Sequence, residues 1–599
     1  MVKKSNIAYL GINSSYSHSM LAYGKLRAWC EAKGVTASWH EFSRTVKDFE
    51  NGLLSEILEV QPCVVIATCY LFNIEAVIKA LGMMKAVSPE IITVVGGPEF
   101  LGDNERFLRT NHFIDYCMRG DESSFEKVIK FVCKGNIQKK QIEGLCYLDE
   151  SNNYIDNRCA LFSGNADELP SLYSMNLFPK NKAFVQYETS RGCPNKCTFC
   201  TSSLSSSKLL LHSLERVRSD LKIIRESGVR EIRMLDRTFN ANKKRTIELL
   251  TMFINEFPEL KFHLEIYPAL IDDEICDVFR TAEKDQFHVE VGVQSLSNEI
   301  LNACQRNFRV EKTVDGIKKL LDVDKFEIHA DLLSGLPLQK LPDIFADVTE
   351  LMELKVDEIQ LEVLKVLAGT PIASNLPKGH AFNPLTPYQV LKTQYLSIRD
   401  LQIADDLSKI IDSFYNNSKL RRCFSEIMQI SNNYLLKFCE FYRIYNNSMQ
   451  KLAINKRFEL LHNFLKENVG DINEKEYYFE LIQFCWLAEA MAPEKYNLKV
   501  FKNETALFSN NDDILKIAGN GDDAIVKINN FISEKIADYT TIKINVNSNE
   551  NPSRFCMFIS DYNFFNNIEN KDKSSNQKNC YIFRYLHGQR LHSITKIEI

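Results

Sequence analysis

The stretch Arg191-Gly192-Cys193-Pro194-Asn195-Lys196-Cys197-Thr198-Phe199-Cys200 places three cysteines in the spacing C-x3-C-x2-C. Three thiolates within eight residues suit a soft metal centre, because sulfur ligands favour iron–sulfur clusters and zinc. The set is one ligand short of the usual four. An iron–sulfur cluster held by Cys193, Cys197 and Cys200 would therefore leave one iron open to a small molecule.

Zinc and a disulfide are the alternatives that the spacing alone leaves open. A zinc site would need a fourth Cys or His at ligand spacing, and the nearest candidates, Cys159 and His212, lie outside any usual spacing. The chain has an odd number of cysteines, 17, and those outside the stretch are scattered, as is typical of a reducing cytosol. The apolar run Ile7 to Ile12 is too short for the core of a signal peptide, and no stretch approaches a membrane span. We therefore expect a cytoplasmic protein with no membrane partner.

Length and charge narrow the classes of protein that this chain could belong to. A chain of 599 residues suggests about three or four domains, and its 45% apolar and 25% charged content is ordinary for a globular protein. The 73 basic and 78 acidic residues give a formal net charge of −5, which does not indicate a broad nucleic-acid-binding surface. We therefore do not expect a nucleic-acid partner.

Residues 1–135 alternate between short apolar runs and helical patterns. Strands are expected at Ile7 to Ile12, Val64 to Thr68, Ile91 to Val95 and Phe113 to Met118, and helices at Met20 to Ala32, Leu53 to Val60, Ile74 to Met84 and Ser124 to Cys133. This alternation predicts an α/β domain with a doubly wound parallel sheet, helices covering both faces. Ligands of such sheets bind at the carboxyl ends of the strands, where four loops follow: 13–18, 69–73, 96–100 and 120–122.

Residues 136–182 are rich in turn residues and predict a connector, and a second alternating series occupies residues 183–380. Its expected strands are Val185 to Thr189, Glu231 to Leu235, Lys261 to Ile266, Phe287 to Gln294, Phe326 to Leu333 and Glu358 to Leu364, with a first helix at Leu209 to Glu226. Six strand–helix units predict a partial or full parallel barrel, with chemistry at the carboxyl ends of its strands. The cysteine stretch follows the first of these strands.

Residues 385–599 predict a third domain. Its first part, 385–495, has a mainly helical pattern with many aromatic residues, and strands are expected at Thr541 to Val546 and Cys580 to Tyr585. The polar segment Asn566 to Asn579 is interpreted as a mobile loop. The five cysteines after residue 400 are too far apart in sequence to indicate a second cluster.

The cysteine stretch, with an aromatic residue before its third cysteine, resembles the signature of radical S-adenosylmethionine (SAM) enzymes. Four later segments resemble family motifs at the expected strand ends: residues 236–240 (Asp-Arg-Thr-Phe-Asn), 290–295 (Glu-Val-Gly-Val-Gln-Ser), 335–337 (Gly-Leu-Pro) and 364–371 (Leu-Lys-Val-Leu-Ala-Gly-Thr-Pro). The N-terminal domain resembles the cobalamin-binding domain of one large subclass. Together the resemblances cover residues 1 to about 380. The C-terminal part resembles an uncharacterised domain appended to some members.

The resemblance implies a 4Fe–4S cluster on the three thiolates, with SAM on the open iron. Reductive cleavage of SAM then yields a 5′-deoxyadenosyl radical that abstracts a hydrogen atom, with electrons from a reducing partner such as flavodoxin or ferredoxin. By position in the family motifs, Phe199 is expected near the adenine, Asp236 at the SAM ammonium, and Gln294 or Ser295 at the ribose. Helix capping is the alternative role for Asp236 and Asn240. Glu265 could contact SAM or substrate, and Asp331 could be a buried, satisfied polar group.

The resemblance also implies a cobalamin site in the N-terminal domain. Many cobalamin domains carry D-x-H-x-x-G, whose histidine ligates cobalt. Here the loop has His18 without the Asp or the Gly, so we interpret His18 as a loop or capping residue; members of the radical SAM subclass usually lack this ligand. The residues expected at the cobalamin pocket are Ser14, Tyr16, Thr68, Tyr70, Asn73, Gly96, Gly97, Glu99, Gly120 and Glu122.

The leading hypothesis is a cobalamin-dependent radical SAM methyltransferase that methylates an unactivated carbon, or phosphorus, of a small-molecule or peptide substrate. One SAM would methylate reduced cobalamin and a second would generate the substrate radical. Three alternatives remain open: cyclisation, rearrangement or oxidation without methyl transfer; methylthiolation, whose enzymes place three further cluster cysteines in the N-terminal domain; and a non-catalytic cobalamin or metal sensor.

Overall fold

The computed structural model divides the chain into two units, Met1–Asp405 and Asp406–Ile599, which are described separately. It describes residues 5–135, 137–180, 182–204, 209–306, 309–446, 450, 452–470, 472–489 and the strands at 505–507, 541–546, 553–560, 579–586 and 590–598. No helix in these ranges is both long enough and apolar enough to cross a membrane.

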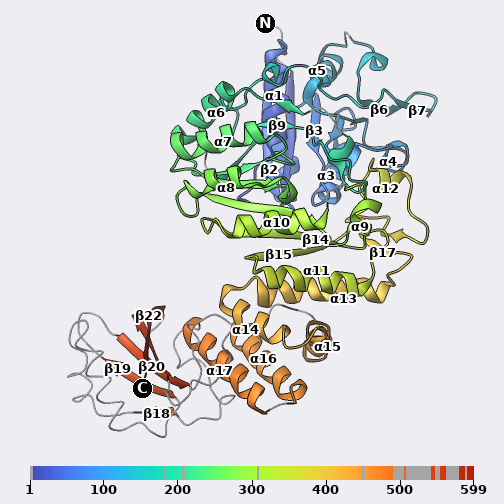
Figure 1. The fold of residues 1–599 in the computed structure, drawn as a ribbon. Helices are drawn as coiled ribbons and strands as arrows, with labels where there is room; N and C mark the ends of the chain where they lie inside the picture. Colours follow the sequence, from blue (N-terminus) through green and yellow to red (C-terminus); the bar gives the residue numbers. More distant parts are fainter. Residues whose placement is uncertain are drawn as a thin grey trace. The chain divides into compact units, whose positions relative to one another are not determined.

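The first unit begins with a seven-stranded sheet in the order β2-β1-β3-β4-β5-β6-β7 (Figure 1). Its five parallel strands are β1 (Asn6–Asn13), β2 (Ser38–Thr45), β3 (Val64–Thr68), β4 (Ile92–Gly96) and β5 (Tyr116–Met118). One face packs against α1 (Leu21–Ala32) and α5 (Phe125–Lys134), and the other against α2 (Leu53–Glu59), α3 (Ile74–Val87) and α4 (Glu105–Thr110). This confirms the predicted doubly wound domain.

The sheet differs from the prediction at both edges. β2 was not expected, because its sequence Ser-Trp-His-Glu-Phe-Ser-Arg-Thr is too polar for a buried parallel strand; it lies at the sheet edge, where one side can remain solvated. At the other edge, β6 (Leu145–Leu148) and β7 (Tyr154–Asp156) pair antiparallel to the rest. The first sheet therefore continues past residue 135 into the segment expected to be a connector.

The second sheet is a partial barrel of six parallel strands in the order β15-β14-β13-β12-β11-β8. The strands are β8 (Phe184–Tyr187), β11 (Glu231–Met234), β12 (Lys261–Ile266), β13 (Phe287–Gln294), β14 (Ile328–Ser334) and β15 (Glu358–Val363). The helices that follow them are α6 (Leu214–Glu226), α7 (Lys243–Glu256), α8 (Asp273–Arg280), α9 (Asn298–Ala303), α10 (Val310–Leu321), α11 (Leu341–Leu354) and α12 (Pro371–Ser374). Because β8 and β15 form opposite edges of the sheet, the barrel is open, as expected for the partial (β/α)6 form.

Strand alternation decides which side chains reach the inside of this barrel. In β13 the buried residues Phe287, Val289, Val291 and Val293 alternate with partly exposed ones, since neighbouring side chains point to opposite faces. The partly exposed positions of the central strands include Glu265, Glu290 and Asp331, which line an internal cavity. The barrel thus presents polar groups inward and apolar groups to its helices.

The first barrel helix begins later than expected. The sequence pattern placed its start at Leu209, but β10 (Leu210–Leu211) pairs antiparallel with β9 (Ser190–Arg191). Helix α6 starts only after Ser213, whose hydroxyl caps it by accepting a hydrogen bond from the Arg216 amide at 3.1 Å. Because β9 leads into the cysteine stretch and β10 follows it, this pair joins the two ends of the segment that carries the three cysteines.

The second unit consists of helices followed by a sheet, in agreement with the predicted helical domain with some strand. Its helical part comprises α13 (Ile398–Ile410, which begins in the first unit), a π-helical turn (Ile411–Tyr415), α14 (Ser418–Met428), α15 (Tyr434–Tyr445), α16 (Ile454–Asn468) and α17 (Ile472–Glu489). Five strands follow: β18 (Thr505–Leu507), β19 (Thr541–Val546), β20 (Ser553–Ser560), β21 (Asn579–Leu586) and β22 (Arg590–Glu598). The loop expected at Asn566 to Asn579 lies outside the described residues, apart from Asn579 itself.

Candidate functional site

The three cysteines of the stretch line one cavity at the carboxyl end of β8. The cavity has a volume of about 240 Å³, and Cys193, Cys197 and Cys200 share its wall with Phe199. The loop is anchored from both sides, because the Thr198 amide donates to the Cys304 carbonyl at 3.0 Å and the Thr198 carbonyl accepts from the Ile372 amide at 3.0 Å. The triad therefore occupies a fixed loop at the predicted edge of the barrel.

The rest of the cavity wall comes from strands β12 to β14 of the barrel and from the segments that follow β11, β12 and β13. The lining residues beyond the cysteine stretch and its next three residues are Arg237, Thr238, Glu265, Ile266, Tyr267, Glu290, Gly292, Gln294, Arg306 and Asp331. Residues within β12, β13 and β14, and the segments after β11, β12 and β13, thus face the cysteine loop across one cavity.

The structure adds a cation to the expected site residues: Arg306, which lies beside the cysteine triad. Its side chain is buried, with Nη1 donating to the Cys197 sulfur at 3.5 Å and Nη2 donating to the Gly292 carbonyl. The guanidinium also lies over the Tyr267 ring, 4.3 Å from its centroid. Sequence reasoning missed this residue, because a single arginine after a short helix carries no periodic signal.

Gly292 leaves the space that this arrangement needs. A Cβ at residue 292 would lie 3.0 Å from the Gln294 side-chain nitrogen and 3.3 Å from Arg306 Nη2, closer than side chains normally tolerate. The strand register shifts between Gly292 and Gln294, and Gln294 has a left-handed φ of 71°. This irregular end of β13 directs Gln294 to the cavity, where it was expected.

The donors at the triad fit an iron–sulfur cluster. Burial raises the pKa of the Cys197 thiol, while Arg306 opposes that shift by stabilising the thiolate. The Thr238 hydroxyl lies 3.5 Å from the Cys193 sulfur. Within the described residues, no three Cys, His, Asp or Glu side chains surround a single point as one metal ion would need. The three thiolates of this loop would each bind a separate iron of a cluster.

Two residues expected at SAM lie elsewhere. Asp236 is 1% exposed and accepts hydrogen bonds from the Thr189 amide and hydroxyl, at 2.8 and 2.6 Å, and from the Ser190 hydroxyl at 2.6 Å. Ser295 is fully buried and donates to Asp347 at 2.8 Å. Neither is among the residues that line the cavity. In this structure Asp236 holds the segment before the cysteine loop and Ser295 fixes the end of β13, while their roles at SAM stay predictions.

Asn240 also has a structural role, but it is not the helix capping that was expected. Its amide donates to the Tyr267 carbonyl at 2.9 Å and its carbonyl accepts from the Tyr267 amide at 2.8 Å. Helix α7 is capped by Asn242 instead, whose side chain accepts from the Arg245 amide. Asn240 thus joins the end of β11 to the end of β12 and positions Tyr267 beneath Arg306.

Three carboxyl groups gather at the base of the cavity. Glu290 contacts His263 at 2.8 Å, and this hydrogen bond lowers the Glu290 pKa to about 2. Burial and the adjacent Glu290 charge raise the pKa of Asp331 to about 9, and burial raises the pKa of Glu265. These shifts favour the charged form of Glu290 and the protonated form of Asp331, so Asp331 is not simply an inert buried group.

Replacing Asp331 with asparagine is expected to remove a pH-dependent loss of stability. The folded-state pKa of Asp331 is raised to about 9, so its stabilising effect is complete below the unfolded pKa near 4 and is lost as pH rises towards 9. An asparagine side chain at this position would be neutral throughout. Unfolding temperatures measured between pH 5 and pH 9 should fall more steeply for the wild type, because its free energy of unfolding declines by up to about 1.4 kcal/mol per pH unit. Parallel curves would contradict the assignment.

A second cavity lies at the carboxyl edge of the first sheet, where cobalamin was expected. It has a volume of about 180 Å³, and six of the expected residues line it: Thr68, Tyr70, Gly96, Gly97, Gly120 and Glu122. Gly97 has a φ of 104°, and a Cβ there would lie 2.6 Å from the Cys69 carbonyl oxygen, so only glycine fits. The glycines keep one wall of this cavity free of side chains.

The other four expected residues do not line this cavity. The Asn73 amide is fully buried, donating to the Ile12 and Thr68 carbonyls at 2.9 and 3.1 Å, and Glu99 accepts from the Tyr388 hydroxyl at 2.9 Å. Ser14 and Tyr16 lie in the loop after β1, and the exposed Tyr16 hydroxyl donates to Asp48. These contacts hold the loops around the cavity, while a role for the four residues at cobalamin stays a prediction.

His18 behaves as a loop residue, in keeping with its interpretation from the sequence. Its Nδ1 lies 2.8 Å from the Ser15 hydroxyl, and its ring packs edge-on against Phe184 at 5.2 Å between centroids. Burial lowers its pKa. It is not among the residues that line the N-terminal cavity.

Comparison with known proteins defines the class of this chain. Residues 187–348 match the radical SAM superfamily and residues 379–544 match a protein family of unknown function, DUF4080. The chain is therefore a radical SAM enzyme with an appended DUF4080 domain. Within that class, its sequence is homologous to radical SAM methyltransferases.

Three relatives illustrate the range of this homology. The uncharacterized methyltransferase PH0819 of Pyrococcus horikoshii is 28% identical over 353 residues, 56% of this chain and 75% of the relative. The cobalamin-dependent radical SAM methyltransferase TokK of Streptomyces tokunonensis is 20% identical over 61% of this chain and 56% of its own length. A tRNA-2-methylthio-N(6)-dimethylallyladenosine synthase of Acinetobacter baumannii is 27% identical over 37% of this chain and 46% of its own length.

Solved structures share the fold. The cobalamin-dependent SAM radical enzyme OxsB, solved with aqua-cobalamin and SAM, aligns with a TM-score of 0.55 at 15% identity, over 89% of this chain and 84% of OxsB. The SAM methyltransferase TsrM of Kitasatospora setae, solved with cobalamin and a [4Fe-4S] cluster, gives a TM-score of 0.52 at 15% identity, over 65% of this chain and 79% of TsrM. At these identities the likeness concerns the fold alone.

Proposed function

We propose that this chain is a cobalamin-dependent radical SAM methyltransferase acting at an unactivated carbon or at phosphorus. The observation that carries the proposal is the joint placement of two cavities in one unit. One holds the cysteine triad and Arg306, and the other lies at the carboxyl edge of the preceding doubly wound sheet. The names of TokK, OxsB and TsrM support the pairing of cobalamin with radical SAM chemistry in relatives of this fold.

The barrel residues fit a cluster and SAM. Cys193, Cys197 and Cys200 would hold a 4Fe–4S cluster, which supplies the electron that cleaves SAM. Arg306 is a buried cation beside Cys197 and offers the charge that a SAM carboxylate needs, while Gln294 and Phe199 line the same wall. Glu290 lines the same cavity and gives it negative charge, which suits the cationic part of SAM.

The first sheet would hold cobalamin through the glycine-lined wall formed by Gly96, Gly97 and Gly120. Cobalamin supplies the methyl group in such chemistry, and the protein residues bind it, orient it and exclude water. We further propose a small-molecule or peptide substrate, and electrons from a reducing protein such as flavodoxin or ferredoxin.

Filling the N-terminal cavity by mutation is expected to abolish cobalamin binding while leaving the cluster intact. Gly96→Leu introduces a side chain into this wall, and a Cβ there meets only Met118 at 3.4 Å, an ordinary contact. Gly96→Ala is the matched control and should retain binding. After anaerobic reconstitution, absorbance spectra should show bound cobalamin in the wild type and Gly96→Ala but not in Gly96→Leu, with equal iron content in all three. Equal cobalamin binding by Gly96→Leu would exclude this cavity as the site.

Methylthiolation is the second candidate, because relatives include methylthiotransferases. That class was expected to place three further cluster cysteines in its N-terminal domain. Here Cys69, Cys117 and Cys146 are fully buried in the hydrophobic core of the first sheet, and burial raises the pKa of each thiol. Such thiols suit packing rather than cluster binding, so we favour methyl transfer. An iron count that fits one cluster per chain supports this choice, whereas a count that fits two clusters would favour methylthiolation.

A further inference from the structure

Arg191 lies two residues before Cys193 and joins the cysteine loop to the N-terminal domain. Its guanidinium makes a bidentate contact with Glu122, at 2.9 and 3.2 Å, and contacts Glu188 at 2.5 Å and Asp121 at 3.6 Å. Glu188 also pairs with Lys25 at 2.8 Å. We call these five residues the Arg191 hub. Only Gly192, with a φ of 100°, separates Arg191 from the first cysteine.

The hub draws its members from both domains of the first unit. Asp121 and Glu122 follow β5 of the first sheet, and Lys25 belongs to α1; all three line the N-terminal cavity. Glu188 and Arg191 follow β8 of the barrel and lead into the cysteine stretch. A single guanidinium therefore bridges a wall of one cavity and the loop that lines the other.

Charge balance makes Arg191 the centre of this cluster. Burial raises the pKa of Glu122, but the charges of Arg191 and Lys25 outweigh that effect and hold it below its usual value. Lys25 and Arg191 likewise hold the pKa of Glu188 well below its usual range against the effect of burial. Removing the guanidinium would leave three poorly solvated carboxylates, Asp121, Glu122 and Glu188, with Lys25 as the remaining cation of the hub, a costly arrangement. The position of the loop after β5 thus depends on where Arg191 lies.

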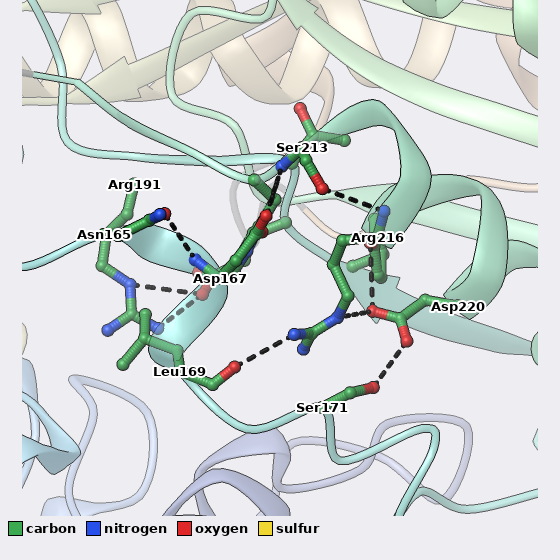
Figure 2. Close-up of polar contacts among 12 residues, drawn as sticks. Asn165, Asp167, Leu169, Ser171, Arg191, Ser213, Arg216 and Asp220 are labelled. Atoms are coloured by element: carbon green, nitrogen blue, oxygen red, sulfur yellow. Dashed lines mark hydrogen bonds and ion pairs between the residues drawn. The ribbon is translucent and has the colours of Figure 1, made fainter.

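The surroundings of the hub on the barrel side are fixed by a second polar network (Figure 2). Arg216 of α6 contacts Asp220 at 2.7 Å and the Leu169 carbonyl at 3.1 Å, and Asp220 accepts from the Ser171 hydroxyl at 2.6 Å. Asp167 accepts from the Ser213 amide at 3.0 Å. These contacts tie the connector to the start and first turns of α6. Arg191, Glu188, Arg216 and Asp220 line one small cavity, so this network lies directly beside the hub.

We propose that Arg191 is a positioning residue that couples the occupant of the N-terminal cavity to the cluster loop. The occupant named here, cobalamin, rests on the proposed function; the coupling itself concerns residues of this chain. By linkage, the coupling is reciprocal: loading the cluster stabilises the loop at Gly120 to Glu122, and filling the cavity stabilises the cysteine loop.

Hydrogen exchange of the full chain, without cobalamin, tests the coupling directly. Cluster loading should slow amide exchange in peptides covering residues 119–125 by at least about fivefold, the lower end of typical coupling between sites. Arg191→Gln should remove this effect, and Glu122→Gln should remove it equally, with the double variant no worse than either. Arg218→Gln is the matched control, since it deletes a guanidinium that contacts Glu256 at 2.8 and 3.0 Å on helices α6 and α7. It should leave the effect intact.

Two results would overturn the proposal: no cluster-dependent protection of residues 119–125 in the wild type, or full protection in Arg191→Gln. Arg191→Gln is not informative if it fails to hold the cluster. In that case Glu122→Gln is used instead, because it leaves the cysteine stretch unchanged. Full cluster-dependent protection of residues 119–125 in Glu122→Gln would then overturn the proposal. A second arm adds aqua-cobalamin and follows exchange at residues 190–200. Failure of the wild type to bind cobalamin would refute the proposed function while the first arm still decides the coupling.

Discussion

Replacing Cys197 with alanine is expected to abolish iron binding and to reduce SAM cleavage by more than about 10³-fold. Cys197 is the most buried of the three cysteines, and Arg306 donates a hydrogen bond to its sulfur. Without this ligand, a cluster with only two thiolates cannot be held. We expect a loss of SAM cleavage this large because the cluster is needed for the whole reaction, whereas removing a single binding contact would cost much less. Iron and sulfide content, with 5′-deoxyadenosine formation under dithionite, provide the measurement.

Cys304 supplies the matched control for this prediction. It is fully buried beside the triad, and its carbonyl, not its sulfur, accepts the bond from the Thr198 amide. Cys304→Ala keeps that backbone contact and should retain iron and activity close to the wild type. Iron loss in Cys304→Ala equal to that in Cys197→Ala would show that Cys304 belongs to the ligand set.

Replacing Arg306 with methionine is expected to weaken SAM binding by roughly 10- to 150-fold. Methionine fills a similar volume but removes the charge beside Cys197 and the donor to the Gly292 carbonyl. A charge-assisted hydrogen bond at a buried site contributes about 1.5–3 kcal/mol, which corresponds to this range of affinity. Isothermal titration of the anaerobic, cluster-loaded protein with SAM measures the change.

Arg237 offers the comparison for Arg306. Its side chain is 53% exposed and lies 3.5 Å from Glu265, so solvent screens its charge. Arg237→Met should change SAM affinity by less than about fivefold. A larger effect from Arg237 than from Arg306 would place the SAM carboxylate beside Arg237 instead.

The fold was predictable where burial and periodicity agree. The expected strands Lys261 to Ile266 and Phe287 to Gln294 coincide with β12 and β13, because buried parallel strands require continuous apolar character on their outward face. β2 was missed because an edge strand can remain polar. The strands β6 and β7 were missed because they are short and lie in a turn-rich segment.

The site was predictable only as far as sequence motifs specify a location. The cysteine triad and Gln294 lie on the cavity wall, since their spacing or strand-end position fixes them there. Asp236 and Ser295 occupy the expected strand ends, but their side chains turn to Ser190 and to Asp347 instead. Position along a strand does not determine the direction of a side chain once the regular strand has ended. Arg306 depends on tertiary packing against Tyr267, which no local pattern reveals.

In the N-terminal domain too, the sequence predicted positions better than it predicted the directions of side chains. The glycines at 96, 97 and 120 line the cavity because a turn at the carboxyl edge of a parallel sheet needs small residues. Asn73 was expected there for its position in the loop, yet its amide satisfies two backbone carbonyls inside the protein. Buried polar side chains usually find such partners, so a polar residue at a strand end is weaker support for a ligand site than a glycine.

The measurement that tests the central claim most directly is the product balance of SAM in the anaerobic protein loaded with cluster and cobalamin. A cobalamin-dependent methyltransferase should release both S-adenosylhomocysteine and 5′-deoxyadenosine, and Gly96→Leu should lose the first product while retaining the second. Formation of 5′-deoxyadenosine alone by the wild type, unchanged by cobalamin, would contradict methyl transfer and favour radical chemistry of another kind.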